Sequence, residues 1–165
     1  KVFNFIDKVF SDFDAIVESF GMFKYHHIQD SYVIACPRSA NPFDAPMHHD
    51  EYVLYSTRRM IQLADCLIRR ARLYFSASGH VLWAKVGISS GPVAGAVVGY
   101  QRRFYCLFGD TINTSARMCS HSEPSRILCT QSVMDVLKRG NFPEISLVEK
   151  PTIDVKGKGL MTCYF

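Results

Sequence analysis

The stretch FGDTINTSARM, from Phe108 to Met118, places two polar side chains where they can meet the same ligand. Asn113 and Arg117 lie four residues apart, so on a helix they project from one face. An amide donates and accepts hydrogen bonds, whereas a guanidinium is always charged and donates through a planar fork. An ordinary solvated helix face has the same spacing. The spacing alone therefore leaves both a binding face and a solvated face open.

The bulk composition limits what kind of protein presents these residues. The chain has 165 residues, of which 48% are hydrophobic and 21% charged, and this balance predicts one globular domain rather than a disordered chain. The net charge of +4 favours an anionic ligand. It is too small to require nucleic acid, because basic residues also solvate ordinary surfaces.

The segment RRFYCLF, residues 102–108, interleaves basic and aromatic side chains. Such a strand loosely resembles the base-stacking strand of RNA-recognition folds, but the glycines of that motif are missing. We interpret it as a core strand with a basic start, and we expect no nucleic-acid partner.

The cysteine pattern and the hydropathy indicate where the chain resides. Six cysteines form no CxxC pair and no zinc-site spacing, so we expect free, mostly buried thiols in a reducing compartment. No apolar run reaches the ~20 residues that span a bilayer. A helical pattern begins at residue 1, which suggests a piece of a larger protein whose membrane segments, if any, lie outside it.

The first part of the chain reads as a helix, a hairpin and a second helix. Apolar residues recur at steps of three and four from Val2 to Phe20, and Gly21 ends that helix. Residues 22–28 and 31–36 read as strands joined by a Gln-Asp turn. After a proline-rich loop at 37–50, a long helix is predicted from about Glu51 to Ser76.

The second part alternates strands with two further helices. The predicted strands are 80–89, 96–100, 103–108, 126–130 and, from 144 to 165, strands broken by a Gly-Lys turn. The predicted helices are Thr111 to about Ser120, with Asp110 as N-cap, and 131–140. The glycines spaced four apart from Gly87 to Gly99 indicate a strand–turn–strand with close backbone approach. The whole predicts an α+β fold with helices packed on a mixed, mostly antiparallel sheet.

Taken together, several segments resemble one family. VGISSGPVAGAVVGYQRRFYCLFGDTINTSARM, residues 86–118, closely resembles the catalytic core of class III nucleotidyl cyclases, and the guanylyl branch most of all. The opening helix, FKYHHIQDSYVIACP and VKGKGLMTCYF follow in the family's order and spacing. The resemblance implies a single ferredoxin-like cyclase catalytic domain over residues 1–165, beginning after the family's first strand.

The resemblance also implies an activity and partners. Class III cyclases convert a nucleoside triphosphate into a 3′,5′-cyclic monophosphate and pyrophosphate. Two catalytic domains, from the same or different chains, pair head to tail, and the active sites lie at their interface. Two divalent metal ions, Mg or Mn, act as cofactors. We expect the domain on the cytoplasmic side, for intracellular signalling, with membrane attachment of a larger protein left open.

Site residues are carried over where this sequence matches the family motifs. Asn113 matches the asparagine that orients the ribose, and Arg117 matches the arginine that stabilises the transition state. Lys156 matches the lysine that contacts the terminal phosphates. Asp30 matches the second metal aspartate, whereas the first belongs to a strand upstream of residue 1.

The base-binding positions decide between GTP and ATP. Cys106 matches the guanylyl type, but His26 stands at the glutamate position and fits neither the guanylyl nor the adenylyl pattern. Gln29 replaces the usual glycine before Asp30. The expected substrate is GTP. An adenylate cyclase domain, or a non-catalytic cyclase-like partner in a heterodimer, is the alternative.

Overall fold

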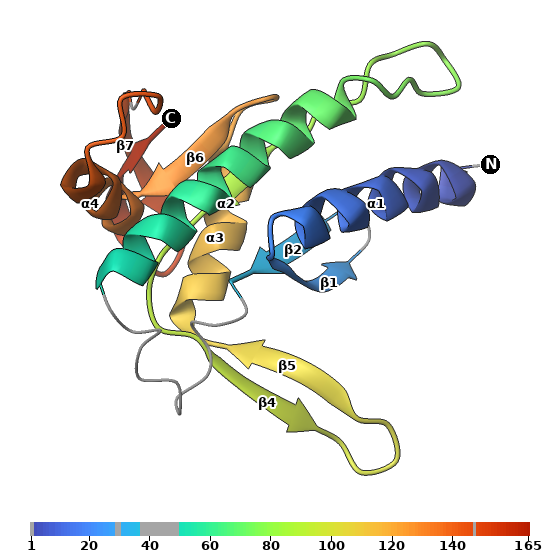
Figure 1. Cartoon of the computed structure of the whole chain (residues 1–165), viewed down its shortest axis with the longest axis horizontal. Helices are drawn as coiled ribbons and strands as arrows, with labels where there is room; N and C mark the ends of the chain where they lie inside the picture. Colours follow the sequence, from blue (N-terminus) through green and yellow to red (C-terminus); the bar gives the residue numbers. More distant parts are fainter. Residues whose placement is uncertain (1, 29–30, 37–49, 147) are drawn as a thin grey trace.

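The computed structural model describes residues 2–28, 31–36, 50–146 and 148–165. The helices are α1 (Val2–Ser19), α2 (Asp50–Ala71), α3 (Asp110–His121) and α4 (Gln131–Gly140). The strands are β1 (Phe23–Ile28), β2 (Ser31–Ala35), β3 (Val86–Ile88), β4 (Ala94–Val98), β5 (Phe104–Phe108), β6 (Ile127–Thr130), β7 (Glu149–Val155) and β8 (Gly159–Tyr164). Figure 1 shows α2 crossing the molecule diagonally with α1 on its right, and the β4–β5 hairpin extending away at the bottom of the view.

The sheet is mixed and mostly antiparallel, as predicted. The strands β3, β6, β8 and β7 form one sheet in that order, in which only β3 and β6 are parallel. The pairs β1–β2 and β4–β5 are separate antiparallel hairpins within the described residues. The β3–β6 connection passes through the β4–β5 hairpin and α3. That crossover brings α3 back against β3.

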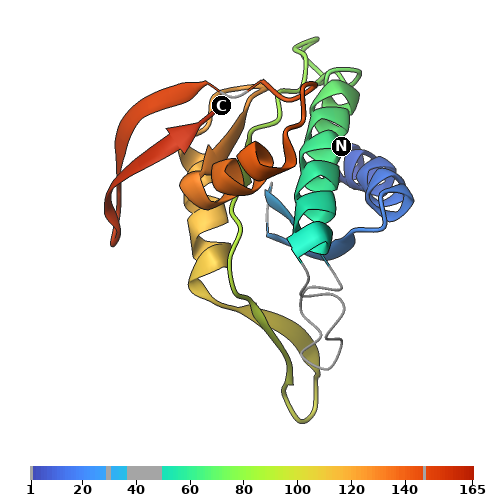
Figure 2. The ribbon, with the colours of Figure 1, turned by 60° about the vertical axis from the view of Figure 1, so that its left-hand side comes forward.

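Alternation along β6 divides the core into two layers. Leu128 and Cys129 are both fully buried and, as neighbours on a strand, face opposite sides of the sheet. Cys129 packs with Ala64 of α2 and Val133 of α4, whereas Leu128 packs with Met118 of α3. Therefore α2 and α4 cover one face of the four-stranded sheet and α3 covers the other (Figure 2).

The helices α1 and α2 pack through the apolar stripes that their sequences predict. The buried residues of this contact are Val9, Phe13, Val17, Leu63, Leu67 and Ala71. Beside this apolar contact, Asp12 of α1 accepts hydrogen bonds from Tyr74 and Arg70. The Tyr74 and Arg70 contacts hold the pKa of Asp12 below its ordinary value. The two helices are thus fastened by an apolar seam and by one polar cluster at its edge.

Several predicted boundaries are wrong. The second helix ends at Ala71 rather than near Ser76, because the chain turns back and the Leu82 amide bonds to the Tyr74 carbonyl at 2.9 Å. The strand predicted over 80–89 is confined to Val86–Ile88, where β6 supplies a pairing partner. The strands predicted from residue 144 begin only at Glu149. In each case the pattern of apolar residues in the sequence is longer than the segment whose backbone forms regular hydrogen bonds.

The cysteine prediction is confirmed in part. All six cysteines are free, but only Cys129 and Cys163 are buried. Burial, with Cys163 nearby, raises the pKa of the Cys129 thiol to about 12, so this thiol stays neutral. None of the described helices combines the length and apolar character that crossing a bilayer requires.

Candidate functional site

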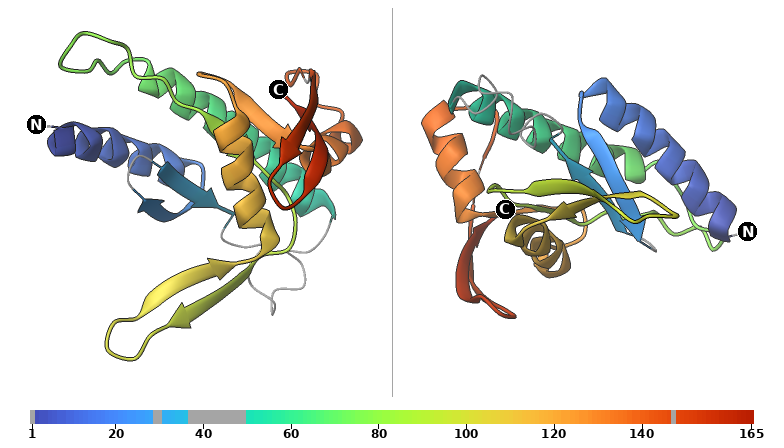
Figure 3. Two further views of the ribbon diagram at one scale, coloured as in Figure 1. Left: turned by 180° about the vertical axis from the view of Figure 1, so that it is seen from behind. Right: turned by 90° about the horizontal axis from the view of Figure 1, so that it is seen from below.

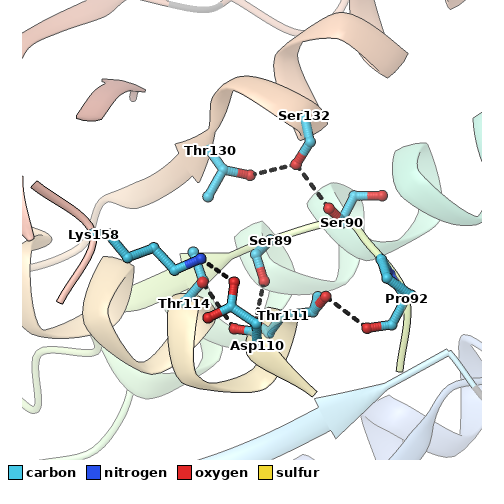
Figure 4. Close-up of polar contacts among 9 residues, drawn as sticks. All are labelled: Ser89, Ser90, Pro92, Asp110, Thr111, Thr114, Thr130, Ser132 and Lys158. Carbon is cyan, nitrogen blue, oxygen red and sulfur yellow. Dashed lines mark hydrogen bonds and ion pairs between the residues drawn. The ribbon is translucent and has the colours of Figure 1, made fainter. Parts of the chain in front are cut away.

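The start of α3 is held by contacts that come from three other segments. Gly109, not Asp110, is the N-cap, and no side chain caps this end of the helix. The predicted capping role of Asp110 is wrong because its carboxylate is ion-paired with Lys158, at the turn between β7 and β8 (Figure 4). The pair fastens that turn to the first turn of α3.

Hydroxyl groups fix the same end of the helix to the segment after β3. Ser89 Oγ donates to the Thr111 carbonyl at 2.5 Å, and Thr111 Oγ1 donates to the Pro92 carbonyl at 2.8 Å (Figure 4). Thr114 Oγ1 donates back to the Asp110 carbonyl at 2.8 Å within the helix. Together these hydrogen bonds fix the orientation of the first turn of α3.

The segment after β3 is in turn held from α4. Ser132 Oγ donates to the Ser90 carbonyl at 2.8 Å and lies 2.8 Å from Thr130 Oγ1 (Figure 4). The residues from Ser89 to Pro92 are therefore fastened both to α3 and to the first turn of α4.

Gly87 lets β3 lie directly against α3. A Cβ atom at this position would lie 2.0 Å from the Cys119 amide nitrogen, 2.4 Å from the Ser115 carbonyl oxygen and 2.6 Å from the Met118 carbonyl carbon. All three atoms belong to the α3 backbone, which cannot move aside as a side chain can. The close backbone approach predicted for this glycine run is confirmed at Gly87.

The two predicted catalytic residues lie on the outer side of α3. Asn113 is exposed and Arg117 half-buried, while Thr114 and Met118 are the buried residues of the helix. A Cβ atom on Gly157 would lie 3.8 Å from Arg117 Nη2. Gly157 has φ +78°, the left-handed turn conformation that a glycine adopts without strain. The turn that carries the exposed Lys156 therefore lies beside the Arg117 guanidinium.

This arrangement suits a phosphorylated ligand. Arg117 on α3 lies beside the turn that carries Lys156 and Lys158, and Lys158 pairs with the Asp110 carboxylate. In the part of the chain that the structure describes, Arg117 forms no ion pair. A guanidinium and a lysine on converging segments can hold several phosphate oxygens together.

The predicted base-binding positions come from two strands. Cys106 is half-buried on β5, and its Cα pairs with that of Ala96 on β4. Residue 26 lies in β1, where its backbone pairs with Val33 of β2. Asp30, the predicted metal ligand, and Gln29 before it lie outside the described residues.

The residues described here do not form a metal site by themselves. No group of three or more His, Cys, Asp or Glu side chains lies close enough together among them to hold an ion. Asp110, the carboxylate nearest to Arg117 on α3, is already paired with Lys158.

Sequence reasoning missed the residues that position the site. The Asp110–Lys158 pair joins residues 48 positions apart, which a local pattern cannot reveal. Lys158, the second lysine of VKGKG, was the only hint in the sequence. A basic residue in a turn is either solvated or paired with an acidic residue. Tyr25, which bonds to β5, gave no signal at all.

Comparison with known proteins gives this geometry its family context. The model of the adenylate and guanylate cyclase catalytic domain matches residues 1–165. The rat guanylate cyclase soluble subunit beta-2 is 30% identical over 165 residues, which cover 100% of this chain and 22% of that protein. The membrane guanylyl cyclase of Dictyostelium discoideum is 30% identical over 167 residues, with 100% and 10% covered. The chain thus spans less than a quarter of the length of either relative.

A solved structure agrees with the sequence relatives. The guanylate cyclase domain of RhGC from Catenaria anguillulae, in complex with GTP, superposes with a TM-score of 0.79 at 28% identity, covering 97% of this chain and 80% of that one. The similarity in fold extends over nearly the whole chain. The chain belongs to the adenylate and guanylate cyclase catalytic domain family.

Proposed function

We propose that this domain converts GTP into 3′,5′-cyclic GMP and pyrophosphate. The observation that carries the proposal is the approach of the Lys156–Gly157 turn to the Arg117 guanidinium, one helical turn beyond the exposed Asn113. These are the groups that a ribose triphosphate needs on one side. Two of the three are cations, and the third is an amide that suits a neutral ribose.

The reaction is an in-line displacement at the α-phosphorus. The ribose 3′-oxygen gives up its proton to water and forms a bond to the α-phosphorus, while the bond between that phosphorus and the oxygen bridging to the β-phosphate breaks and pyrophosphate leaves. Negative charge grows on the phosphoryl oxygens in the transition state. Arg117 is placed to stabilise that charge, and Asn113 to hold the ribose so that the 3′-oxygen is aligned. Lys156 neutralises the leaving pyrophosphate.

Divalent metal ions belong to this proposal as cofactors. Domains of this family generally use them, and we assign Asp30 as one ligand for a pair of Mg²⁺ or Mn²⁺ ions. Bound there, the ions would neutralise triphosphate charge and favour the deprotonated 3′-oxygen.

The β4–β5 hairpin supports a second cyclase domain as partner. Its exposed apolar side chains are Val97, Val98, Tyr100, Phe104, Tyr105 and Phe108. A two-stranded hairpin is marginal by itself, and an exposed apolar patch of this kind marks an interaction site. Figure 3 shows the hairpin extending beyond the body of the domain. We propose that it contacts a second copy of this chain, arranged head to tail.

This pairing explains why one chain carries two half-sites. Asp30 of one copy would face Asn113, Arg117 and Lys156 of the other. The Dictyostelium relative is a membrane guanylyl cyclase. We place the domain on the cytoplasmic side, where GTP is available, whether or not the whole protein is anchored.

The direct test is turnover by the whole protein with Mn²⁺ and either GTP or ATP. We expect cyclic GMP and pyrophosphate in equal amounts, and little cyclic AMP. A preference for ATP would assign the adenylate alternative. Absence of turnover with either nucleotide would make the domain a non-catalytic partner.

The base positions give a sharper prediction. Replacing Cys106 with Asp together with His26→Lys should lower the GTP/ATP ratio of kcat/KM by roughly tenfold or more, because donor and acceptor roles toward the base are exchanged. The measurement is initial rates with each nucleotide. The matched control is Cys66→Asp, the same change at a half-buried cysteine on α2, which should leave the ratio unchanged. An unaltered ratio in an active double variant would remove these residues from the base pocket.

The Asp110–Lys158 pair predicts a smaller effect. Lys158→Met frees the β7–β8 turn from α3, so Lys156 spends less time beside Arg117. The pair is partly exposed, and such pairs contribute at most about 1 kcal/mol, so we expect KM for GTP to rise roughly two- to fivefold. Lys138→Met on α4 removes the same charge elsewhere and should leave KM alone. Equal KM values in both variants would show that the pair does not position the turn.

A further inference from the structure

The strands that carry the two base positions are joined by a side chain that the proposed mechanism does not use. Tyr25 of β1 accepts a hydrogen bond from the Leu107 backbone amide of β5 at 3.1 Å. The strands β1 and β5 belong to different sheets within the described residues. A tyrosine hydroxyl therefore takes the place of a backbone ladder between them.

A second contact keeps the same register. Phe23 meets Tyr105 edge to face, with ring centroids 5.9 Å apart and an interplanar angle of 89°. Both contacts advance by two residues along each strand, from 23 to 25 and from 105 to 107. The two strands therefore run in the same direction where they meet. Cys106 lies between Tyr105 and Leu107, the two contacted residues of β5.

The tyrosine reaches β5 because β1 is irregular at this point. Lys24 pairs with Ile34 and residue 26 with Val33, so Tyr25 is an extra residue without a Cα partner on β2. A bulge of this kind bends the strand and re-aims the neighbouring side chain. Tyr25 is half-buried, so its ring is partly packed, and its hydroxyl oxygen accepts a hydrogen bond from the Leu107 amide.

We propose that Tyr25 is a positioning residue for guanine recognition, through a hydrogen bond that fixes the spacing between residue 26 on β1 and Cys106 on β5. The proposal rests on the proposed function, because it assumes that these two positions read the base. The bonded amide directly follows Cys106, and residue 26 directly follows Tyr25. A shift of either strand changes the width of the space that the base must fill. The effect falls on base affinity rather than on the phosphoryl chemistry at Arg117.

The test uses Tyr25→Phe, which removes only the hydroxyl. Affinities of the whole protein for 3′-deoxy-GTP and 3′-deoxy-ATP, which cannot cyclise, are measured by calorimetry. We expect the Kd of 3′-deoxy-GTP to rise roughly three- to tenfold, with a smaller change for 3′-deoxy-ATP. The KM for GTP should rise by a similar factor, while kcat stays within about twofold. Tyr55→Phe, at an exposed tyrosine of α2, is the matched control and should change none of these values.

Hydrogen exchange supplies a readout that does not depend on nucleotides. In Tyr25→Phe the Leu107 amide should exchange faster, while the Cys106 amide, in the β4–β5 pairing, keeps its protection. Faster exchange at Leu107 with unchanged affinities would show a purely structural role and overturn the proposal.

The wild-type affinities separate this proposal from the proposed function. If wild-type protein binds the two nucleotides equally, the guanine preference fails. In that case, a positioning role for Tyr25 predicts that Tyr25→Phe weakens the binding of both nucleotides. Unchanged affinity for both would overturn that role.

Discussion

Replacing Arg117 with alanine is expected to lower turnover of GTP by roughly 10²–10³-fold, the usual cost of removing one preorganised group that stabilises transition-state charge. The guanidinium is half-buried on α3 and lies beside the Gly157 turn, where triphosphate oxygens would collect. Its charge matters most when negative charge grows on the α-phosphoryl oxygens. The loss should therefore appear in kcat, with a smaller change in KM. Initial rates at several GTP concentrations measure both.

Two further variants give the prediction its control. Arg117→Lys keeps the charge but loses the planar fork, so an intermediate rate is expected. Arg139→Ala removes an arginine from the last turn of α4 and should leave turnover within about twofold. The free energy of unfolding of Arg117→Ala should lie within about 1 kcal/mol of the wild-type value, because the side chain is only partly buried. Near-normal turnover in a folded Arg117→Ala protein would remove this residue from the mechanism.

The second large effect is expected in folding, at Gly87. A methyl group there would meet three backbone atoms of α3, the nearest at 2.0 Å. Overpacking of a well-packed contact typically costs about 1–3 kcal/mol, and more where backbone must move. We expect Gly87→Ala to lower the free energy of unfolding by roughly 3 kcal/mol or more. Because α3 carries Asn113 and Arg117, the protein that still folds should also lose most of its activity.

Urea unfolding measures this cost directly. Gly79→Ala is the matched control, because nothing lies within 4 Å of its Cβ position and only its φ of +80° opposes the change. That strain costs about 1–2 kcal/mol, so the control should be less destabilised than Gly87→Ala. If both variants were equally stable, the contact between β3 and α3 would be looser than described.

Local patterns predicted the elements well and their ends poorly. The apolar stripe of α1 correctly identified Val9 and Phe13, because a helix repeats its buried face every three to four residues. The same rule extended α2 past Ala71, since Tyr74 continues the stripe although the chain has already turned. A stripe records which residues are buried. It does not record which backbone bonds are made.

The shared face of Asn113 and Arg117 was predictable, whereas the contacts that position it were not. Asn113 and Arg117 lie within one short motif, so their shared face follows from helical spacing alone. Asp110 was assigned to cap its own helix, but a lysine from a distant turn takes its carboxylate. Tyr25 depends on a bulge in β1 and on the approach of β5, and neither leaves a mark in the sequence. The roles of all the assigned site residues remain predictions, namely those of Asn113, Arg117, Lys156, Cys106, residue 26 and Asp30.

In the proposed head-to-tail dimer, each active site combines residues from two copies of the domain. The most direct test is complementation between Asp30→Asn and Arg117→Ala in the whole protein, each nearly inactive alone. Random pairing makes half of the dimers mixed, and each mixed dimer has one intact site of two, so co-expression should restore about a quarter of wild-type turnover. Activity no higher than that of the separate variants would contradict the shared site.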